Sequence, residues 1–285
     1  VGAAALFAVL ALLMVRALGA DALHSPTASA GELRALVQRS SVLGALNDAL
    51  PPSGPLLRVL REVSPTPVVR GPDPDVPPPD PTLADDPEID AAARSVVRVT
   101  GVACGLGVAG SGWVARPGIV VTNAHVVAGQ EETLVTSADG VESEAQVVFY
   151  EPRDDLAVLA GGDLDVPALG LDSAPLKGEG GAVAGYPENG PLTVVPARLG
   201  TTGVVASQDS YGRGPIRRRM TAFRADVRSG TSGGPVLDGR GRVMATVFAA
   251  SAEQGPPSGL GVPNELVAAA LEGPLEPVEP GPCAA

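Results

Sequence analysis

Three short segments of the sequence carry residue types that could together perform nucleophilic catalysis. The segment 122–127, TNAHVV, contains His125, the segment 154–159, DDLAVL, opens with two aspartates, and the segment 229–235, SGTSGGP, contains Ser232. A serine hydroxyl becomes an effective nucleophile when an adjacent imidazole takes its proton. The imidazole in turn needs a carboxylate that fixes its tautomer and stabilises the imidazolium. The three segments supply these groups in the order histidine, aspartate, serine.

Each segment on its own has a simpler interpretation. A histidine at a strand end can be a core residue, an acidic pair can be solvated charge, and a glycine-rich turn can be an ordinary loop. The serine segment is the most specific, because the glycines around Ser232 let the backbone aim two N–H groups at a developing oxyanion. All three segments, in the order found in the chymotrypsin-like branch of the Ser-His-Asp hydrolases, favour catalysis.

The sequence around these segments predicts the elements that position them. From residue 89 onward short apolar runs alternate with glycine, which is typical of an all-β sandwich or a pair of barrels. The expected strands are 95–102, 118–122, 144–150, 156–160, 182–185, 192–196, 203–206 and 243–248. The good helix candidate here is 264–271, and the basic run 217–219 is expected in a loop. About 185 residues can bury roughly 70% of the unfolded surface, which is enough for a core.

The region before residue 89 differs in composition. Residues 1–20 are apolar and predict a transmembrane helix, the last of a bundle, with a signal peptide as the alternative. Residues 21–63 predict short amphipathic juxtamembrane helices broken at two prolines. Residues 64–88 are rich in Pro and Asp, which predicts a semi-extended linker that holds the following domain away from the membrane.

The composition of the 285 residues excludes several classes of function. The formal net charge of −12 argues against nucleic-acid binding, because counterion release needs basic patches. Two cysteines exclude a zinc site built from cysteine alone and a disulfide-dense scaffold. Only 3% of the residues are aromatic, so the core must be built from Val, Leu and Ala. We expect no metal and no cofactor.

Residues 89–272 resemble the trypsin-like serine proteases, in the bacterial branch that includes the HtrA proteases. TNAHVV, DDLAVL and SGTSGGPV match the three motifs of that family, and GSGWVA at 110–115 resembles the strand before the histidine loop. GRVMATVFA at 241–249 resembles the strand that pairs with substrate, and 259–267 resembles the closing strand and helix. The layout is similar to the membrane-anchored actinobacterial proteases of the acid-resistance type, whose membrane bundle resembles the colicin V production protein.

The resemblance implies a fold and a set of roles. The fold is all-β, with two six-stranded barrels of the chymotrypsin-like kind, and the activity is that of a serine endopeptidase acting through an acyl-enzyme. Ser232 is the implied nucleophile and His125 the general base. Asp155 is the orienting carboxylate, with Asp154 as its rival. The backbone amides of Gly230 and Ser232 form the implied oxyanion hole.

One acidic residue is a candidate for substrate specificity. Asp226 lies six residues before the serine, and in trypsin-like proteases this spacing places a residue at the floor of the primary specificity pocket. A carboxylate there selects Arg or Lys before the scissile bond, and Ala249 and Ala250 are the expected wall. The alternative is that Asp226 faces solvent or pairs with Arg224 or Arg228.

The two cysteines, Cys104 and Cys283, lie far apart in the sequence. They are either unrelated thiols or a disulfide, and an even count in an extracytoplasmic domain favours the disulfide. The bond would close most of the protease domain into one loop and hold the Pro-rich tail, 273–285. The predicted membrane helix places the chain in the cell membrane, with an extracytoplasmic, periplasmic protease domain. The sequence leaves the oligomeric state open, and a monomer is favoured for the protease domain. The resemblance implies that this domain acts on proteins or peptides, in the response to envelope, acid or oxidative stress.

Two other classes of function stay open. One is a catalytically silent relative that acts as a binding module, although the complete set of three catalytic residue types speaks against it. The other is an esterase with the same triad. The β-rich sequence and the absence of a G-x-S-x-G elbow disfavour the α/β-hydrolase form of that alternative.

Overall fold

The computed structural model describes residues 71–161, 164–251 and 255–284. All of these residues belong to one compact unit, 53–285. The predicted transmembrane helix at 1–20 and the predicted amphipathic helices at 21–63 lie outside the described residues. None of the helices in the described part of the chain combines the length and the apolar composition that a bilayer crossing requires.

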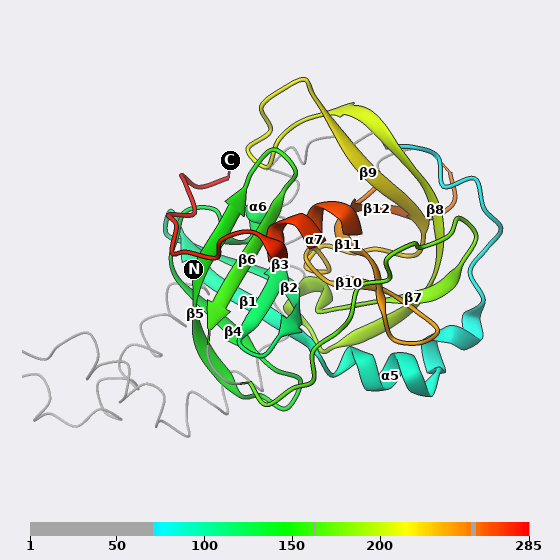
Figure 1. Cartoon of the computed structure of the whole chain (residues 1–285), viewed down its shortest axis with the longest axis horizontal. Coiled ribbons are helices and arrows are strands. Elements are labelled where there is room, and N and C mark those ends of the chain that lie inside the picture. The colour runs from blue at the N-terminus through cyan, green and yellow to red at the C-terminus, as the bar shows by residue number, and fades with distance from the viewer. Residues whose placement is uncertain (1–70, 162–163, 252–254, 285) are drawn as a thin grey trace, which may run out of the picture. The chain divides into compact units, whose positions relative to one another are not determined.

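The first six strands close into a barrel in the order β1-β2-β3-β6-β5-β4, with every neighbouring pair antiparallel (Figure 1). The strands are β1 (Val96–Ala103), β2 (Leu106–Arg116), β3 (Ile119–Thr122), β4 (Gln130–Thr136), β5 (Glu142–Glu151) and β6 (Leu156–Gly161). Its interior is filled by Val, Ala and Leu, including Val97, Val99 and Leu159, which are fully buried. Small branched side chains thus build this core, as the low aromatic content predicts.

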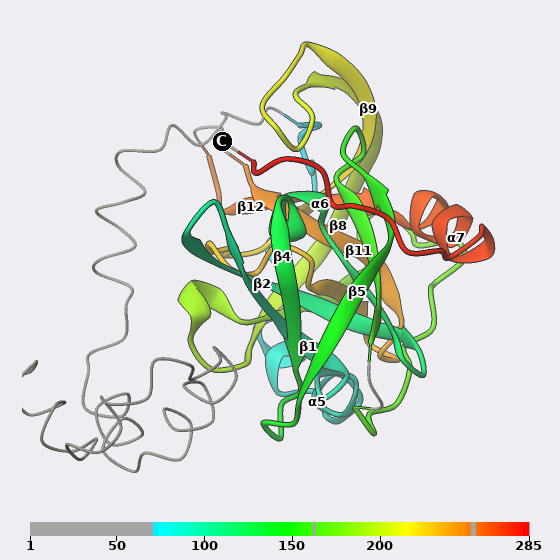
Figure 2. The ribbon, with the colours of Figure 1, turned by 90° about the vertical axis from the view of Figure 1, so that its left-hand side faces the viewer.

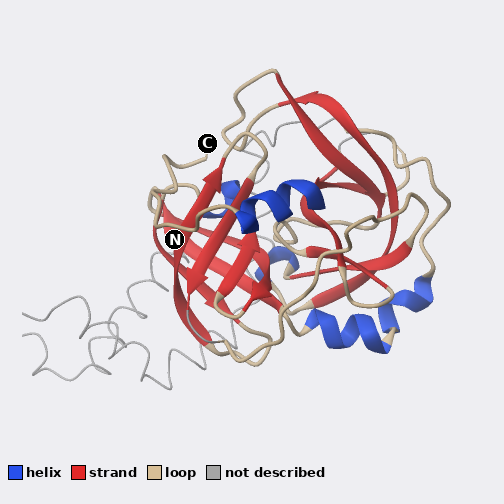
Figure 3. Ribbon diagram, viewed as in Figure 1, coloured by secondary structure: helices blue, strands red, loops and turns tan. Residues whose placement is uncertain are grey.

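The next six strands close into a second antiparallel barrel in the order β10-β11-β12-β9-β8-β7. The strands are β7 (Gly180–Gly185), β8 (Thr193–Ser207), β9 (Ile216–Arg224), β10 (Pro235–Asp238), β11 (Val243–Ala250) and β12 (Ser258–Pro263). The predicted fold of two β-barrels is therefore confirmed, and Figure 3 shows how strands dominate the domain.

The prediction of a loop at 217–219 is wrong, because these residues lie in β9. Arg217 and Arg219 are exposed, whereas Arg218 is buried between them. The exposure of these side chains alternates along the strand, as its period of two requires. Because the inward-facing residue is an arginine, the sequence shows no alternation of apolar and polar residues here.

Three helices complete the described domain. Helix α7 (Asn264–Glu272) confirms the predicted helix. Helix α5 (Pro87–Ala93) follows a 3-10 turn at Pro81–Asp85 and begins where the Asp86 side chain accepts hydrogen bonds from the next amides. Helix α6 (Ala124–Val127) is a single turn that carries His125.

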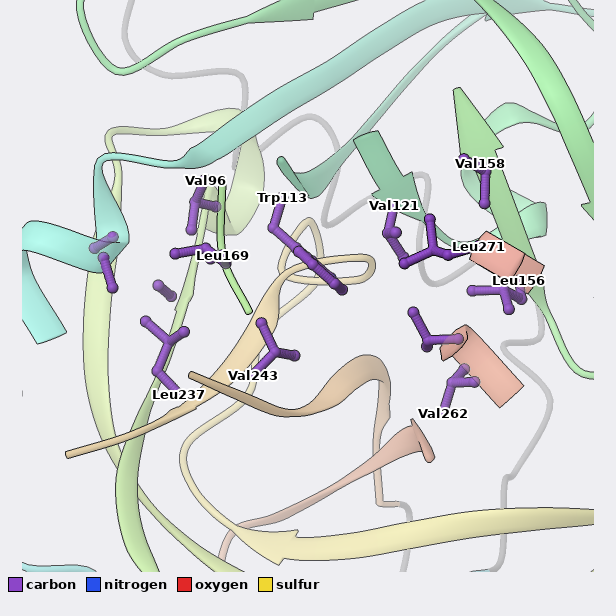
Figure 4. Packing of buried hydrophobic residues seen from close by; sticks show 14 of the residues in the cluster. Val96, Trp113, Val121, Leu156, Val158, Leu169, Leu237, Val243, Val262 and Leu271 are labelled. Atoms are coloured by element: carbon purple, nitrogen blue, oxygen red, sulfur yellow. The ribbon is translucent and has the colours of Figure 1, made fainter. Parts of the chain in front are cut away.

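Trp113 connects the two barrels (Figure 4). The side chain starts on β2, is fully buried, and donates from Nε1 to Thr246 Oγ1 on β11 at 3.1 Å. It belongs to a core cluster that also includes Leu156 of the first barrel and Leu237 and Val243 of the second. The two barrels therefore share apolar packing.

Residues 71–80, which we call the strap, lie along the second barrel (Figure 1). Arg224 Nη1 donates to the Val76 carbonyl at 2.8 Å, and Arg198 Nε donates to the Pro78 carbonyl at 3.1 Å. The described part of the predicted linker thus packs against the protein instead of spanning free solvent. Proline-rich sequence cannot form a core, but its extended backbone exposes carbonyls that arginines on a neighbouring sheet can bind.

The C-terminal tail returns from α7 across the first barrel (Figures 1 and 2). The Val278 amide donates to the Val147 carbonyl at 2.9 Å, so the tail is bonded to β5. Cys104 and Cys283 form a disulfide with a Cα–Cα distance of 6.2 Å. The expected bond is present and holds the end of the tail beside the β1–β2 hairpin.

Candidate active site

His125 follows strand β3 on the one-turn helix α6. Buried Val126 and Val127 fix the helix to the first barrel, while the His125 side chain stays 31% exposed. Asn123, the residue before the helix, donates from Nδ2 to the Asp155 carbonyl at 2.9 Å. The helix start is therefore tied directly to the turn that carries the aspartate.

Asp155 holds His125 at two points. His125 Nδ1 lies 2.7 Å from Asp155 Oδ2, and the His125 backbone amide donates to Asp155 Oδ1 at 2.8 Å. The Asp155 side chain is fully buried, and its φ of 56° turns it back from the start of β6 toward the histidine. This arrangement suits a carboxylate that orients an imidazole with the proton on Nδ1.

Asp154 has a different environment. It is half-buried, and no hydrogen bond joins it to His125 among the described residues. Burial raises the pKa of Asp154, the nearby Glu151 carboxylate raises it further, and Arg218 and Arg153 oppose these effects. Of the two aspartates, Asp155 is therefore the one that contacts the imidazole.

The turn around Ser232 needs its glycines. Gly230 and Gly233 have φ values of 90° and 86°. A Cβ at Gly233 would lie 2.0 Å from the Ser111 carbonyl oxygen. The Ser111 amide donates to the Ser232 carbonyl at 2.8 Å and Ser111 Oγ donates to the Gly230 carbonyl at 2.8 Å, so β2 fixes the turn from the first barrel.

The two predicted oxyanion donors lie in this turn. Among the described residues, the amides of Gly230 and Ser232 donate to no other group. Buried or half-buried amides usually find a partner, so unpaired donors are notable. Both remain available for the oxygen of a ligand.

Phe248 on β11 links the serine to the histidine. The Ser232 hydroxyl donates to the Phe248 carbonyl at 3.0 Å. The Phe248 ring packs edge-to-face on His125, with ring centroids 6.1 Å apart. In the described part of the chain no hydrogen bond joins Ser232 Oγ to His125. The sequence places Phe248 in the substrate-pairing strand, but its contacts with both residues depend on the fold.

The predicted specificity residues lie near the ends of strands in the second barrel. Asp226 is exposed and pairs with Arg228 Nη2 at 3.2 Å, which is one of the alternatives raised from the sequence. Ala249 is half-buried and Ala250 is exposed at the end of β11. Their role in a pocket stays a prediction.

One acidic cluster in the described residues has the composition of a metal site. Carboxylate oxygens of Asp172, Glu179 and Asp238 lie within 4.8 Å of one another. Arg242 is 2.7 Å from Asp238 and 3.3 Å from Asp172. The guanidinium already compensates the negative charge, so the cluster acts as an ion-pair network.

Known proteins resemble this chain in sequence and in fold. Residues 110–245 match the family described as trypsin-like peptidase domain. The crystal structure of the active form of the Rv3671c protease from M. tuberculosis is 37% identical, with a TM-score of 0.70, and the match covers 78% of this chain and 100% of that one. This chain belongs to the trypsin-like peptidase family.

Two curated relatives show how much of this trypsin-like chain, and how much of each relative, the sequence match covers. The serine protease Rv3671c of Mycobacterium tuberculosis is 37% identical over 238 residues, which is 77% of this chain and 58% of the relative. A probable periplasmic serine endoprotease, DegP-like, of Hahella chejuensis is 36% identical over 47% of this chain and 28% of its own length. The chain thus spans little more than half the length of the mycobacterial relative.

Proposed function

We propose that this chain is a membrane-tethered, extracytoplasmic serine endopeptidase that cleaves proteins or peptides through an acyl-enzyme. The proposed triad is His125, Asp155 and Ser232. The observation that carries the proposal is the double contact of buried Asp155 with His125, together with Phe248, which touches both His125 and Ser232. Orienting carboxylate, base and nucleophile therefore belong to one site.

The proposed reaction begins with the serine hydroxyl. Ser232 Oγ leaves the Phe248 carbonyl and gives its proton to His125 Nε2 as it attacks the scissile carbonyl. Such hydrogen bonds often form only when substrate is bound. Asp155 stabilises the imidazolium, and the free amides of Gly230 and Ser232 bind the oxyanion. His125 then protonates the leaving amine. In the second half of the reaction, water attacks the acyl-enzyme while His125 takes its proton, and His125 returns that proton to Ser232 Oγ as the acid product leaves.

The substrate preference is proposed from the second barrel. Ala249 and Ala250 at the end of β11 would line a pocket for a substrate side chain, and Asp226 would select Arg or Lys there. The pairing of Asp226 with Arg228 requires that a basic substrate displace an exposed arginine. The test is to profile the cleavage sites of wild type and Asp226→Ala in a mixed peptide library. A preference for Arg or Lys before the cut that is lost in Asp226→Ala supports the role. A preference for apolar residues that is the same in both proteins rejects it.

The proposed location follows from the disulfide and the relatives. A bond between Cys104 and Cys283 persists in oxidising compartments and is rare in the cytosol. The DegP-like relative is described as periplasmic. The membrane tether is proposed from the apolar residues 1–20, and the role in envelope, acid or oxidative stress is proposed from the resemblance to the acid-resistance group.

The test is covalent labelling of the full chain with a fluorophosphonate, combined with a peptidase assay. Wild type should be labelled and active, and Ser232→Ala should be neither. Ser229→Ala is a matched control in the same turn and should be labelled like wild type. If wild type is not labelled and does not cleave peptides, the chain is a silent binding module and the proposal is wrong.

A further inference from the structure

Arg218 is a buried cation next to the proposed active site. It lies on β9 of the second barrel and is 4% exposed, while its neighbours Arg217 and Arg219 are exposed. Arg218 Nη1 donates to the Arg153 carbonyl at 3.3 Å. Arg153 belongs to the turn of the first barrel that carries Asp155, so this side chain crosses from one barrel to the other.

Arg218 also packs on the residue that links the serine and the histidine. Its Cζ lies 4.1 Å from the centroid of the Phe248 ring, which is within cation–π distance. The same ring contacts His125 with its edge, and the Phe248 carbonyl accepts the Ser232 hydroxyl. Arg218 is therefore one side chain away from both reacting groups.

The hydrogen bonds of Arg218 are incomplete. Among the described residues, its Nε and Nη2 atoms are buried and have no partner. Burial lowers the pKa of the guanidinium, and the carboxylates of Asp155, Asp154 and Asp209 oppose this effect, Asp155 most strongly. Unpaired buried donors on a cation are costly, so packing stability alone does not explain the residue.

The positions of its contacts supply the explanation. The Arg153 carbonyl that Arg218 binds lies two residues before the fully buried Asp155, in the turn that carries this aspartate. The Phe248 ring on which Arg218 packs contacts His125. Arg218 therefore joins the turn of the aspartate to the residue that contacts the histidine.

We propose that Arg218 is a positioning residue of the active site, which braces Phe248 against His125 and ties it to the turn that carries Asp155. The inference rests on the proposed peptidase function. The Phe248 carbonyl accepts the Ser232 hydroxyl and its ring contacts His125, so a shift of Phe248 would displace the nucleophile relative to the base. Proton transfer between the two requires hydrogen-bond distance, so such a shift lowers kcat.

The test compares three variants of the full chain by steady-state hydrolysis of one peptide, with kcat calculated per active site titrated by a fluorophosphonate. Arg218→Met removes the charge and keeps an apolar stem, Arg218→Lys keeps a charge, and Arg217→Met is the exposed neighbour on the same strand. Arg218→Met should lower kcat about tenfold with little change in KM. Arg218→Lys should restore kcat toward wild type, because an ammonium can also pack on the Phe248 ring, and Arg217→Met should match wild type.

The outcomes separate this role from a structural one. A structural residue would lower the melting temperature and the number of titrated active sites, but would leave kcat per titrated site unchanged. An unchanged kcat per titrated site in Arg218→Met, or the same loss in Arg217→Met, overturns the proposal. If Arg218→Met does not fold, Arg218→Gln is measured by the same criteria. Fluorophosphonate labelling of wild type is the independent check: without labelling the peptidase function fails, whereas labelling with an unchanged kcat in Arg218→Met refutes only the role of Arg218.

Discussion

Replacement of Asp155 by asparagine tests the proposed active site most directly. Asp155 accepts two hydrogen bonds from His125, one from the backbone amide to Oδ1 at 2.8 Å and one at the ring, where Nδ1 is 2.7 Å from Oδ2. Asparagine has one acceptor oxygen and one donor amide in nearly the same shape. If its oxygen stays on the backbone amide, its NH₂ group faces Nδ1 of the ring.

The imidazole must then change its tautomer. Nδ1 becomes the acceptor, the proton moves to Nε2, and Nε2 can no longer take the proton of the Ser232 hydroxyl. The loss of the carboxylate also removes the charge that stabilises the imidazolium. We expect Asp155→Asn to lower kcat on the order of 10⁴-fold. This corresponds to a barrier increase of roughly 5–6 kcal/mol at 1.36 kcal/mol per decade.

Asp154→Asn is the matched control. Asp154 is adjacent, half-buried and not bonded to His125, so its replacement should change kcat less than about threefold. The assay is steady-state hydrolysis of a reporter peptide, with active-site titration to correct for misfolded protein. Equal losses in the two variants, or a larger loss in Asp154→Asn, would show that the carboxylate is wrongly assigned.

Three further changes test what holds the domain together. Cys283→Ser should lower the free energy of unfolding by up to about 4–5 kcal/mol, because the disulfide closes a span of 179 residues; a urea midpoint equal to that of oxidised wild type would contradict this. Thr246→Val should cost about 1–3 kcal/mol by leaving Trp113 Nε1 unpaired, and Thr246→Ser should restore the melting temperature. Arg224→Met should cost about 1–2 kcal/mol by freeing the strap carbonyl of Val76, and should increase proteolysis within 71–80; no change in either would show that the strap is dispensable.

The sequence was informative where a local pattern determines the structure. Most strands were predicted because Val and Ala alternate with polar or small residues between turn signals. The one-turn helix that carries His125 was not predicted, since four residues contain no helical period. The sequence pattern predicts a loop for the basic run in β9, because Arg218 occupies an inward position where a strand pattern has an apolar residue.

The parts that the sequence did not predict depend on contacts between distant residues. The strap has no hydrophobic period, and its binding depends on Arg198 and Arg224, more than a hundred residues away. The resemblance places Phe248 in a substrate-pairing strand, but its contact with His125 depends on how the two barrels meet. Local patterns predict the residue types of the proposed triad. The residues that support each of them come from the opposite barrel, such as Phe248 beside His125 and Ser111 beside the serine turn.

This division follows from the construction of the site. His125 and Asp155 come from the first barrel and Ser232 from the second, so the geometry of the proposed triad depends on the placement of one barrel against the other. Three contacts between the barrels fix that placement. Trp113 lies in the shared core, Ser111 is bonded to the serine turn, and Arg218 is bonded to the aspartate turn. A small error in placement would cost more activity than stability, since transfer of a proton requires hydrogen-bond distance. Substitutions at these inter-barrel contacts should therefore lower kcat before they unfold the protein.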